Sequence, residues 1–367
     1  MKKAKVSIFF SSFDRGGAEK IAVNLSKGLV INGVYVDILT ANTLIPSFLS
    51  FLSSSIRLIS LSCNSKVDLE RKLIAYLEET KPWVLVFWKG FERLSADLIK
   101  RSKNYTKIIV RVGTTFTERD KNRNIIKRLF SKLVLKRNIK FIDKTIAVSK
   151  GVAEDIIKLT KVPKEKVYIL PNPTIVPEIF DMAKEEIDHE WFRKKDFFKV
   201  LGVGGFRRSK DFPTLVKAFD IVRKKLSARL IILGDGRQRR KIESIIDKLN
   251  LKDYVWLPGF KENPYSFMEK SDVFVLSSKW EGCPNVLIES MALGTPVVST
   301  DCPSGPREIL CDGRYGILVP VGDKEKLADA IIKTLTNPLP EDVLKKAVKK
   351  YDYIESTKAY LKIFELY

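Results

Sequence analysis

The chain has 367 residues and carries 66 Lys and Arg against 44 Asp and Glu, a formal net charge of +22. Its apolar fraction of 45% excludes a disordered protein, and no apolar run reaches the ~18–20 residues of a membrane-spanning helix. A chain of this length usually folds as about two domains.

Cysteine and histidine usage narrows the possible chemistry. The four cysteines show no C-x-x-C spacing, which argues against a disulfide framework or a zinc site. We therefore expect reduced thiols in a cytosolic protein. The single histidine, His189, lies in a charged stretch, so neither a histidine-based metal site nor a Ser-His-Asp mechanism is expected.

The positive charge is concentrated in the first half of the chain. Residues 1–180 contain 33 Lys and Arg and 16 Asp and Glu, a balance of +17, whereas the remaining residues contain 33 and 28, a balance of +5. Residues 101–140 alone contain 13 cationic and 2 acidic residues. Such a field attracts polyanions, which include nucleic acid, anionic membranes and phosphorylated substrates.

Strands and helices alternate in the first half. Residues 5–10 predict a first strand and not a signal peptide, because polar residues follow Phe10 directly. Residues 18–31 have helical apolar spacing, which Asn32-Gly33 ends. Further strands are expected at 34–40, 84–88, 107–112, 144–148 and 167–170, and further helices at 69–80 and 153–159. This order predicts a doubly wound α/β unit.

A second unit follows a break at three prolines, 171, 173 and 177, and a charged segment that reads as a linker or surface helix. Its expected strands are 198–203, 228–233, 254–257, 272–276 and 296–299, and its expected helices are 212–225, 237–249, 284–293 and 324–336. Residues after 337 are mostly helical in pattern. We predict a domain of residues 1–180, a domain of residues 181–345 and a C-terminal helix, 346–367, that packs on the first domain.

Residues 281–289, Glu-Gly-Cys-Pro-Asn-Val-Leu-Ile-Glu, follow a predicted buried strand. Pro284 suits the first turn of a helix, so Glu281 lies at the end of the strand and Glu289 lies within the helix. The first turn of a helix offers backbone N–H groups and the positive end of the helix dipole, which suit a phosphate. Two acids around such a turn would suit a sugar nucleotide, because carboxylates accept hydrogen bonds from hydroxyl groups.

Seven short motifs occur in one order along the chain, at 16–19, 203–212, 234–236, 257–260, 281–289, 294–298 and 316–320. Together they resemble the retaining glycosyltransferases of family four, over roughly the whole chain and most strongly from 198 to 335. The resemblance implies the GT-B fold, an α/β architecture of two Rossmann-like domains facing across a cleft. Residues 304–309, Ser-Gly-Pro-Arg-Glu-Ile, resemble members that use hexose or N-acetylhexosamine donors in surface-glycan assembly.

In this family the C-terminal domain binds a nucleotide-sugar, most often a UDP-sugar. The resemblance implies that Glu289 binds the ribose hydroxyls, that Glu281 contacts the donor sugar and that Lys210 pairs with the diphosphate. Other implied donor-binding residues are Gly16 and Gly17, Phe260 beside the base, and Cys283, Pro284, Asn285, Val286 and Leu287 at the helix start. Alternatively, Gly16-Gly17 is only a turn into a helix, Lys210 is solvated with Asp211 as an N-cap, and 234–236 is a simple turn.

The chain departs from the family pattern at two points. Many relatives have Gly-Arg where this chain has Gly204-Gly205, so Arg207 or Arg208 would substitute for a missing diphosphate-binding arginine. Many relatives also place a histidine in the N-terminal domain, where residues 111–117 have none. We expect Thr114 or Thr115 to line the site instead.

The resemblance implies sugar transfer with retention of anomeric configuration. The favoured scheme is front-face displacement, in which the protein positions the reactants and stabilises charge on the leaving diphosphate. We assign catalytic roles to Glu281, Lys210, Arg207 and Arg208. The chain has no Asp-x-Asp pair, so no essential metal is expected, and no cofactor beyond the donor substrate.

Residues 121–137 place apolar side chains at 125, 126, 129, 130, 133 and 134, with Lys and Arg on the other face. This pattern fits a basic amphipathic helix on an anionic bilayer, and equally an ordinary helix that packs its apolar side on the sheet. The charge favours a lipid-diphosphate-linked glycan acceptor and a peripheral enzyme on the cytoplasmic leaflet.

Two other function classes fit parts of the sequence. A related GT-B enzyme could use a soluble acceptor, as sucrose and glucan synthases do. A non-enzymatic nucleic-acid-binding protein is suggested by charge alone, but the chain shows no such module and no aromatic stacking pattern, so no nucleic-acid partner is expected. A dehydrogenase is disfavoured because no G-x-G-x-x-G follows the first strand.

Overall fold

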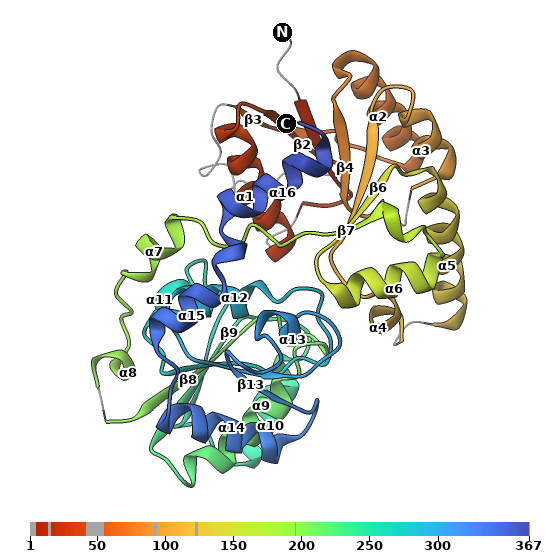
Figure 1. Ribbon diagram of the computed structural model, residues 1–367. Coiled ribbons are helices and arrows are strands. Elements are labelled where there is room, and N and C mark those ends of the chain that lie inside the picture. Colours follow the sequence, from red (N-terminus) through yellow and green to blue (C-terminus); the bar gives the residue numbers. More distant parts are fainter. Residues whose placement is uncertain are drawn as a thin grey trace. The chain divides into compact units, whose positions relative to one another are not determined.

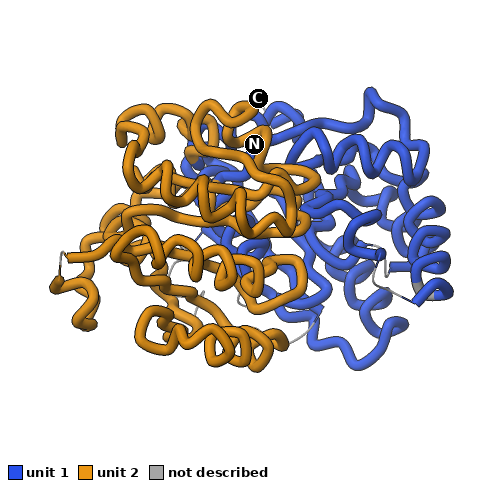
Figure 2. Tube along the Cα trace, turned by 90° about the horizontal axis from the view of Figure 1, so that it is seen from below, with its two compact units in different colours: residues 1–173, 353–367 blue, residues 174–352 orange. Residues whose placement is uncertain are grey.

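The computed structural model describes residues 5–13, 16–41, 55–91, 94–121, 124–194 and 196–366, except for the side chain of residue 127. The chain divides into two compact units (Figure 2). Each unit is built on its own parallel sheet. Unit 1 comprises residues 1–173 and 353–367, and unit 2 comprises residues 174–352. The predicted α/β architecture of two doubly wound domains is confirmed.

Unit 1 contains a parallel sheet of seven strands in the order β3-β2-β1-β4-β5-β6-β7 (Figure 1). The central strands are almost continuously apolar because helices cover both faces. The strands are β1 (Lys5–Phe10), β2 (Tyr35–Thr40), β3 (Ile56–Ser60), β4 (Val84–Lys89), β5 (Lys107–Val112), β6 (Lys144–Ala147) and β7 (Val167–Ile169). The strand β3 was not predicted; it is an edge strand whose residues after Ile56 are only partly buried or exposed.

The helices of unit 1 pack around this sheet. They are α1 (Gly17–Ile31), α2 (Lys66–Thr80), α3 (Ala96–Ser102), α4 (Phe116–Asp120), α5 (Ile125–Asn138), η3 (Ile139–Phe141), α6 (Lys150–Thr160), η4 (Lys164–Lys166) and α16 (Tyr353–Phe364). The C-terminal helix α16 lies along α1 (Figure 1). It buries Tyr360 and Phe364 in the core of unit 1. A Cβ atom at Gly28 would lie 2.1 Å from the Thr357 hydroxyl oxygen, so glycine permits this close crossing.

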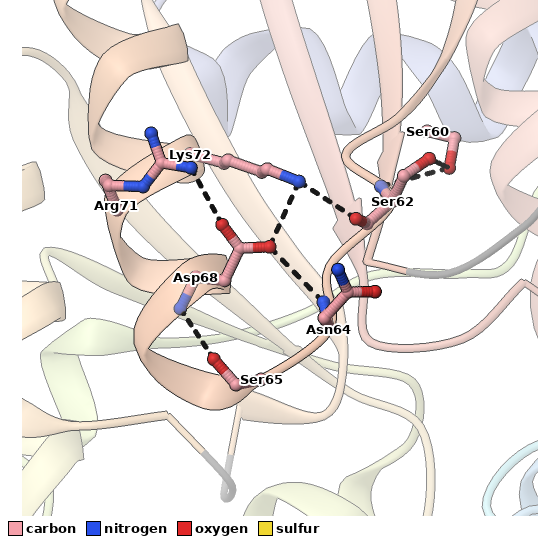
Figure 3. Close-up of polar contacts among 7 residues, drawn as sticks. All are labelled: Ser60, Ser62, Asn64, Ser65, Asp68, Arg71 and Lys72. Carbon is pink, nitrogen blue, oxygen red and sulfur yellow. Dashed lines mark hydrogen bonds and ion pairs between the residues drawn. The ribbon is translucent and has the colours of Figure 1, made fainter.

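Helix α2 begins with a network of side-chain hydrogen bonds (Figure 3). The Ser65 hydroxyl accepts from the Asp68 backbone N–H at 3.1 Å, which satisfies one N–H group of the first turn. The Asp68 carboxylate accepts from Lys72, Arg71 and the Asn64 backbone N–H, and these contacts lower the pKa of Asp68 to about 2. The network therefore holds a negative charge at the positive end of the helix.

Unit 2 contains a parallel sheet of six strands in the order β10-β9-β8-β11-β12-β13. The strands are β8 (Phe198–Val203), β9 (Ala228–Leu233), β10 (Val255–Gly259), β11 (Val273–Leu276), β12 (Val297–Thr300) and β13 (Ile317–Val319). The helices are α7 (Glu178–Ala183), α8 (Glu190–Arg193), α9 (Phe212–Arg223), α10 (Arg239–Lys248), α11 (Tyr265–Glu269), α12 (Asn285–Ala292), α13 (Pro306–Ile309), α14 (Lys324–Thr336), α15 (Glu341–Ala347) and η5 (Lys349–Tyr351).

The division between the units differs from the expected domain boundaries at 180 and 345. The backbone N–H groups of Thr174 and Ile175 both donate to the Tyr351 carbonyl, at 2.9 and 3.0 Å, and Ile175 forms a parallel bridge with Asp352. Residues 174–180 and 346–352 therefore belong to unit 2. This pairing joins segments far apart in the chain, so local sequence pattern does not reveal it.

Candidate active site

The strand order of unit 2 reverses between β8 and β11. From β8 the chain proceeds through β9 and β10 to one edge of the sheet, and from β11 it proceeds through β12 and β13 to the other. The loops that follow β8 and β11 therefore diverge at the carboxyl end of the sheet, where open α/β sheets bind ligands. Lys210 lies in the loop after β8, and Glu281 lies in the loop after β11.

These two residues form an ion pair across the reversal point. Lys210 Nζ lies 2.7 Å from Glu281 Oε1, and their side chains are only 20% and 13% exposed. The Ser278 hydroxyl donates to the same Glu281 oxygen at 2.6 Å. The Ser277 hydroxyl donates to the Lys210 carbonyl at 2.8 Å and holds the two loops together. Lys210 is therefore not a solvated surface lysine.

The residue after Lys210 also has structural partners. Asp211 occupies the N-cap position of α9, as the alternative interpretation expected, although its side chain does not cap the helix. Its carboxylate accepts from the Thr214 hydroxyl at 2.8 Å and pairs with Lys279 at 3.3 Å. These contacts fix the backbone on both sides of the Lys210–Glu281 pair.

A buried thiol lies behind this pair. Burial, with a smaller effect from the negative charge of Glu281, raises the pKa of Cys302 to about 12. The hydroxyl of Thr300, at the end of β12, donates to the Ser278 carbonyl at 2.6 Å and supports the same loop. Cys302 is thus protonated at neutral pH and has no thiolate character for nucleophilic chemistry.

Helix α12 begins beside Glu281 without a side-chain cap. It starts at Asn285, one residue later than predicted, because Pro284 adopts an extended N-cap conformation. Gly305 has φ = +96°, and a Cβ atom there would lie 2.7 Å from Pro284 Cδ and 3.0 Å from the Gly282 carbonyl oxygen. The segment around Gly305 thus packs directly on the turn that leads into α12, which only glycine allows.

The predicted donor-binding residues of α12 differ in accessibility. Asn285 and Val286 are partly exposed, whereas the Leu287 side chain is fully buried and its N–H donates to the Pro284 carbonyl at 3.0 Å. Leu287 is therefore already bonded within the first turn. Glu289 is only 4% exposed, so it is not a solvated acid on the helix face.

Cys283, Phe260 and the two candidate arginines lie in neighbouring loops. Cys283 is partly exposed between Glu281 and the start of α12. Arg207 and Arg208 are exposed in the loop that contains Lys210, and in the described part of the chain neither has an ion-pair partner. Phe260 follows β10 and exposes 55% of its surface. These side chains of unit 2 are therefore accessible to a bound ligand.

The loop at 234–236 packs on the loop after β8. A Cβ atom at Gly234 would lie only 2.0 Å from the Gly204 carbonyl oxygen, and Gly234 has φ = +135°. The Gly234 N–H donates to the Gly259 carbonyl at 2.9 Å. Gly234 therefore allows the loops after β8, β9 and β10 to pack closely together.

The predicted N-terminal residues all lie in unit 1. Gly16 is the N-cap of α1 and Gly17 is its first residue. Thr114 is partly buried after β5, and Thr115 is a buried N-cap of α4. A Cβ atom at Gly16 would lie 2.7 Å from Glu19 Oε2, so glycine leaves room for that carboxylate.

An ion pair that the sequence pattern did not predict lies at the corresponding reversal point of unit 1, between β1 and β4. Lys89 Nζ at the end of β4 lies 2.9 Å from Oε1 of the buried Glu19 in α1. Each unit therefore has a Lys–Glu ion pair at the point where its strand order reverses. The sequence feature that could have indicated this pair is the charged Lys89 at the end of an otherwise apolar strand.

Two family models match the two parts of the chain. Residues 15–175 match Glycosyltransferase Family 4, and residues 183–351 match Glycosyl transferases group 1. An uncharacterized glycosyltransferase of Methanocaldococcus jannaschii is 31% identical over 315 residues, which cover 75% of this chain and 76% of the relative.

A second relative has a more specific name. The N-acetylgalactosamine-N,N'-diacetylbacillosaminyl-diphospho-undecaprenol 4-alpha-N-acetylgalactosaminyltransferase of Campylobacter jejuni is 34% identical over 250 residues. This match covers 67% of the present chain and just under two thirds, 64%, of the relative.

Solved structures share the fold. The lipopolysaccharide outer core galactosyltransferase WaaB has a TM-score of 0.72 at 17% identity, with 99% of this chain and 100% of WaaB covered. The HepE protein of Anabaena in complex with UDP and glucose has a TM-score of 0.79 at 15% identity, with 99% and 100% covered.

Proposed function

Because the chain belongs to the glycosyltransferases of group 1 and family 4, we propose that it transfers a hexose or N-acetylhexosamine from a UDP-sugar to a lipid-linked glycan. The transfer retains the anomeric configuration of the sugar. The observation that carries this proposal is the Lys210–Glu281 pair at the strand-order reversal of unit 2, beside the uncapped start of α12.

The donor diphosphate binds at the start of α12 in this proposal. The N–H groups of Asn285 and Val286 and the positive end of the helix dipole attract an anion there. Lys210 adds a formal positive charge, which Glu281 holds in place before the donor arrives. The partly exposed Cys283 and the buried Pro284 shape the approach to this turn. UDP is the first nucleotide to test, because HepE, which has the same fold, was solved with UDP.

The nucleoside occupies the adjacent surface of unit 2. Glu289 accepts hydrogen bonds from the ribose hydroxyls, and its burial makes these bonds stronger than they would be in water. The exposed ring of Phe260 stacks beside the base. From unit 1, we assign donor contacts to the backbone at Gly16 and Gly17 and to Thr114 or Thr115.

Catalysis in this proposal is front-face displacement. The bond between the anomeric carbon and the diphosphate oxygen breaks while the acceptor hydroxyl attacks from the same face, and a diphosphate oxygen takes the hydroxyl proton. Lys210 stabilises the charge that accumulates on the departing diphosphate, together with Arg207 or Arg208. Glu281 positions Lys210 and contacts the donor sugar. None of these steps requires a metal ion.

The acceptor is a glycan on a lipid diphosphate, and the enzyme works peripherally on the inner leaflet of the membrane. The name of the Campylobacter relative specifies a diphospho-undecaprenol-linked acceptor, and another relative takes part in lipopolysaccharide core biosynthesis in Rhizobium meliloti. The excess of cations in residues 101–140 favours an anionic acceptor or surface.

The test is a transfer assay with the purified full-length chain. A panel of UDP-sugars is incubated with lipid-diphosphate-linked glycans and with matched soluble oligosaccharides, and products are identified by mass spectrometry and anomeric NMR. An α-linked product from an α-configured donor, formed on the lipid-linked acceptor, is expected. Transfer to the soluble oligosaccharides alone would show that the acceptor is soluble and not lipid-linked. A product with inverted anomeric configuration would refute the retaining mechanism.

A further inference from the structure

Helix α5 in unit 1 has an apolar face that the described residues leave uncovered. Ile125, Ile126, Leu129, Phe130 and Leu133 are 55% to 73% exposed. These positions share one face of the helix, because residues three and four apart lie above one another. They are five of the fourteen exposed large apolar side chains in the described part of the chain, gathered within nine residues.

The opposite face of α5 attaches the helix to unit 1. Leu135 is buried, and the helix packs against α3 and α6. The buried amide of Asn138 donates to the Leu94 carbonyl at 2.9 Å and fixes the C-terminal end. The interpretation in which the apolar side of this segment packs on the sheet is therefore wrong for these residues. The helix instead presents its apolar side outward.

Cationic side chains border this apolar face. Arg128, Lys132 and Arg137 are exposed, and Lys136 is partly exposed in the last turn. The sequence contains no Asp or Glu between Asp120 and Asp143. A second copy of the chain docked on this face would bring like charges together in a symmetric interface. An anionic bilayer surface complements both the apolar row and the cations beside it.

We propose that α5 is a membrane-docking helix, which lies in the plane of an anionic bilayer with Ile126, Leu129, Phe130 and Leu133 inserted among the lipids. Arg128 and Lys132 then lie at the level of the phosphate headgroups. The helix is about 21 Å long at 1.5 Å per residue, too short to span the hydrocarbon core. Among the helices of the described residues, none has the length and apolarity to cross a bilayer.

This inference rests on the proposed function in one respect, namely that a lipid-linked acceptor brings the enzyme to a bilayer surface. It extends that function by naming the side chains that make the contact. It also makes docking separable from donor binding, because the docking face lies in unit 1 and the proposed nucleotide site lies mainly in unit 2.

The experiment measures flotation of the full-length chain with vesicles of phosphatidylglycerol and phosphatidylcholine, or of phosphatidylcholine alone. The apolar variant is I126S/L129S/F130S, and its control is I31S/V67S, which removes exposed apolar side chains from α1 and α2. The charge variant is R128Q/K132Q, and its control is K100Q/K158Q at exposed positions of α3 and α6. Each protein is assayed at about 0.1 M and about 1 M salt, where the Debye lengths are about 10 and 3 Å.

We expect wild type and both controls to float with anionic vesicles at the lower salt concentration. The apolar variant should lose at least about tenfold in binding to these vesicles. The charge variant should lose about fivefold for each charge removed, and this loss should vanish on phosphatidylcholine and at high salt. UDP affinity, measured by calorimetry, should be unchanged in all variants.

Three results would overturn the proposal. The first is that the wild type does not float at low salt, and the second is that the apolar variant binds vesicles as well as the wild type. The third is that the wild type is a dimer that binds no vesicles and that the apolar variant is a monomer. Failure of the proposed function has a different signature. In that case UDP binding or sugar transfer is absent while flotation and its dependence on α5 persist.

Discussion

The ammonium of Lys210 and the carboxylate of Glu281, 71 residues apart in sequence, meet at 2.7 Å where unit 2 reverses its strand order. Neither loop alone defines this geometry. Since Ser278 also donates to Glu281, the carboxylate is held by two donors and in turn holds the lysine. A preorganised cation of this kind needs little rearrangement as charge develops on a leaving group.

Replacing Lys210 should therefore affect turnover more than donor affinity. We expect Lys210→Ala to lower kcat by roughly 10²–10³-fold, the usual cost of losing one charge-stabilising donor. Lys217→Ala, at an exposed position of α9, is the matched control and should behave as wild type. Steady-state kinetics with the preferred donor would measure both, and an unchanged kcat in Lys210→Ala would remove that lysine from the mechanism.

Replacing Glu289 should affect donor affinity first. Glu289→Gln keeps the shape of the buried side chain but removes its charge, and hydrogen bonds to charged groups contribute about 1.5–3 kcal/mol. UDP should therefore bind roughly 10- to 150-fold more weakly by calorimetry. Circular dichroism of the same variant would verify its fold. Equal UDP affinity in a folded variant would refute the ribose contact.

Gly234 should resist substitution because its neighbour is backbone. A Cβ atom there would lie 2.0 Å from the Gly204 carbonyl oxygen, so Gly234→Ala must displace the loop after β8 and should cost more than about 2 kcal/mol of unfolding free energy. Gly259→Ala is the control: Gly259 has φ = +85° with no atom within 4 Å, so it incurs only the left-handed backbone penalty of about 1–2 kcal/mol. Urea titration would measure the free energy of unfolding of both variants. A lower value for Gly259→Ala than for Gly234→Ala would contradict this explanation.

The single histidine should titrate below its ordinary range. His189 stacks on Trp256 with ring centroids 3.8 Å apart, and its Nδ1 accepts from the Trp191 backbone N–H at 3.2 Å. Burial lowers the pKa of His189 despite the opposing charges of Glu190 and Asp188. NMR titration of the one imidazole should give a folded-state pKa below the model-peptide value of about 6.5.

This shift has a defined effect on stability. As the pH falls through about 6.5, His189 becomes protonated in the unfolded chain but stays neutral in the folded protein. The free energy of unfolding therefore decreases until the pH reaches the folded-state pKa. The variant His189→Asn keeps an N-capping side chain but does not titrate, and should lose this part of the pH dependence. Identical pH profiles of urea stability in the two proteins would contradict the assignment.

The four cysteines should differ in reactivity. Cys311 is exposed, whereas burial raises the pKa of Cys302 to about 12. Maleimide at neutral pH should label Cys311 rapidly and Cys302 only on unfolding, because the thiolate is the reactive form. Peptide mass spectrometry over a time course would measure the order. Early labelling of Cys302 would show that its loop opens in the native state.

Local pattern predicted most of the secondary structure. Apolar runs such as 84–88 and 107–112 predicted buried parallel strands, and the structure places β4 and β5 at Val84–Lys89 and Lys107–Val112. The edge strand β3 was not predicted because its residues after Ile56 are only partly buried or exposed, so the segment lacks the continuous apolar run of a central strand. The helix at 284–293 was predicted with its start one residue early, since Pro284 serves as the N-cap.

Local sequence pattern predicted most of the helices and strands, and the order of the motifs indicated the family, because apolar period and turn residues are local properties. Which side chains lie in contact could be established only from the folded chain. It paired Lys210 with Glu281 and Lys89 with Glu19, and it turned the apolar face of α5 outward instead of toward the sheet. The physical reason is that such contacts depend on strand order and on which helix face the neighbouring elements cover, and neither property is encoded in the spacing of residues along one segment.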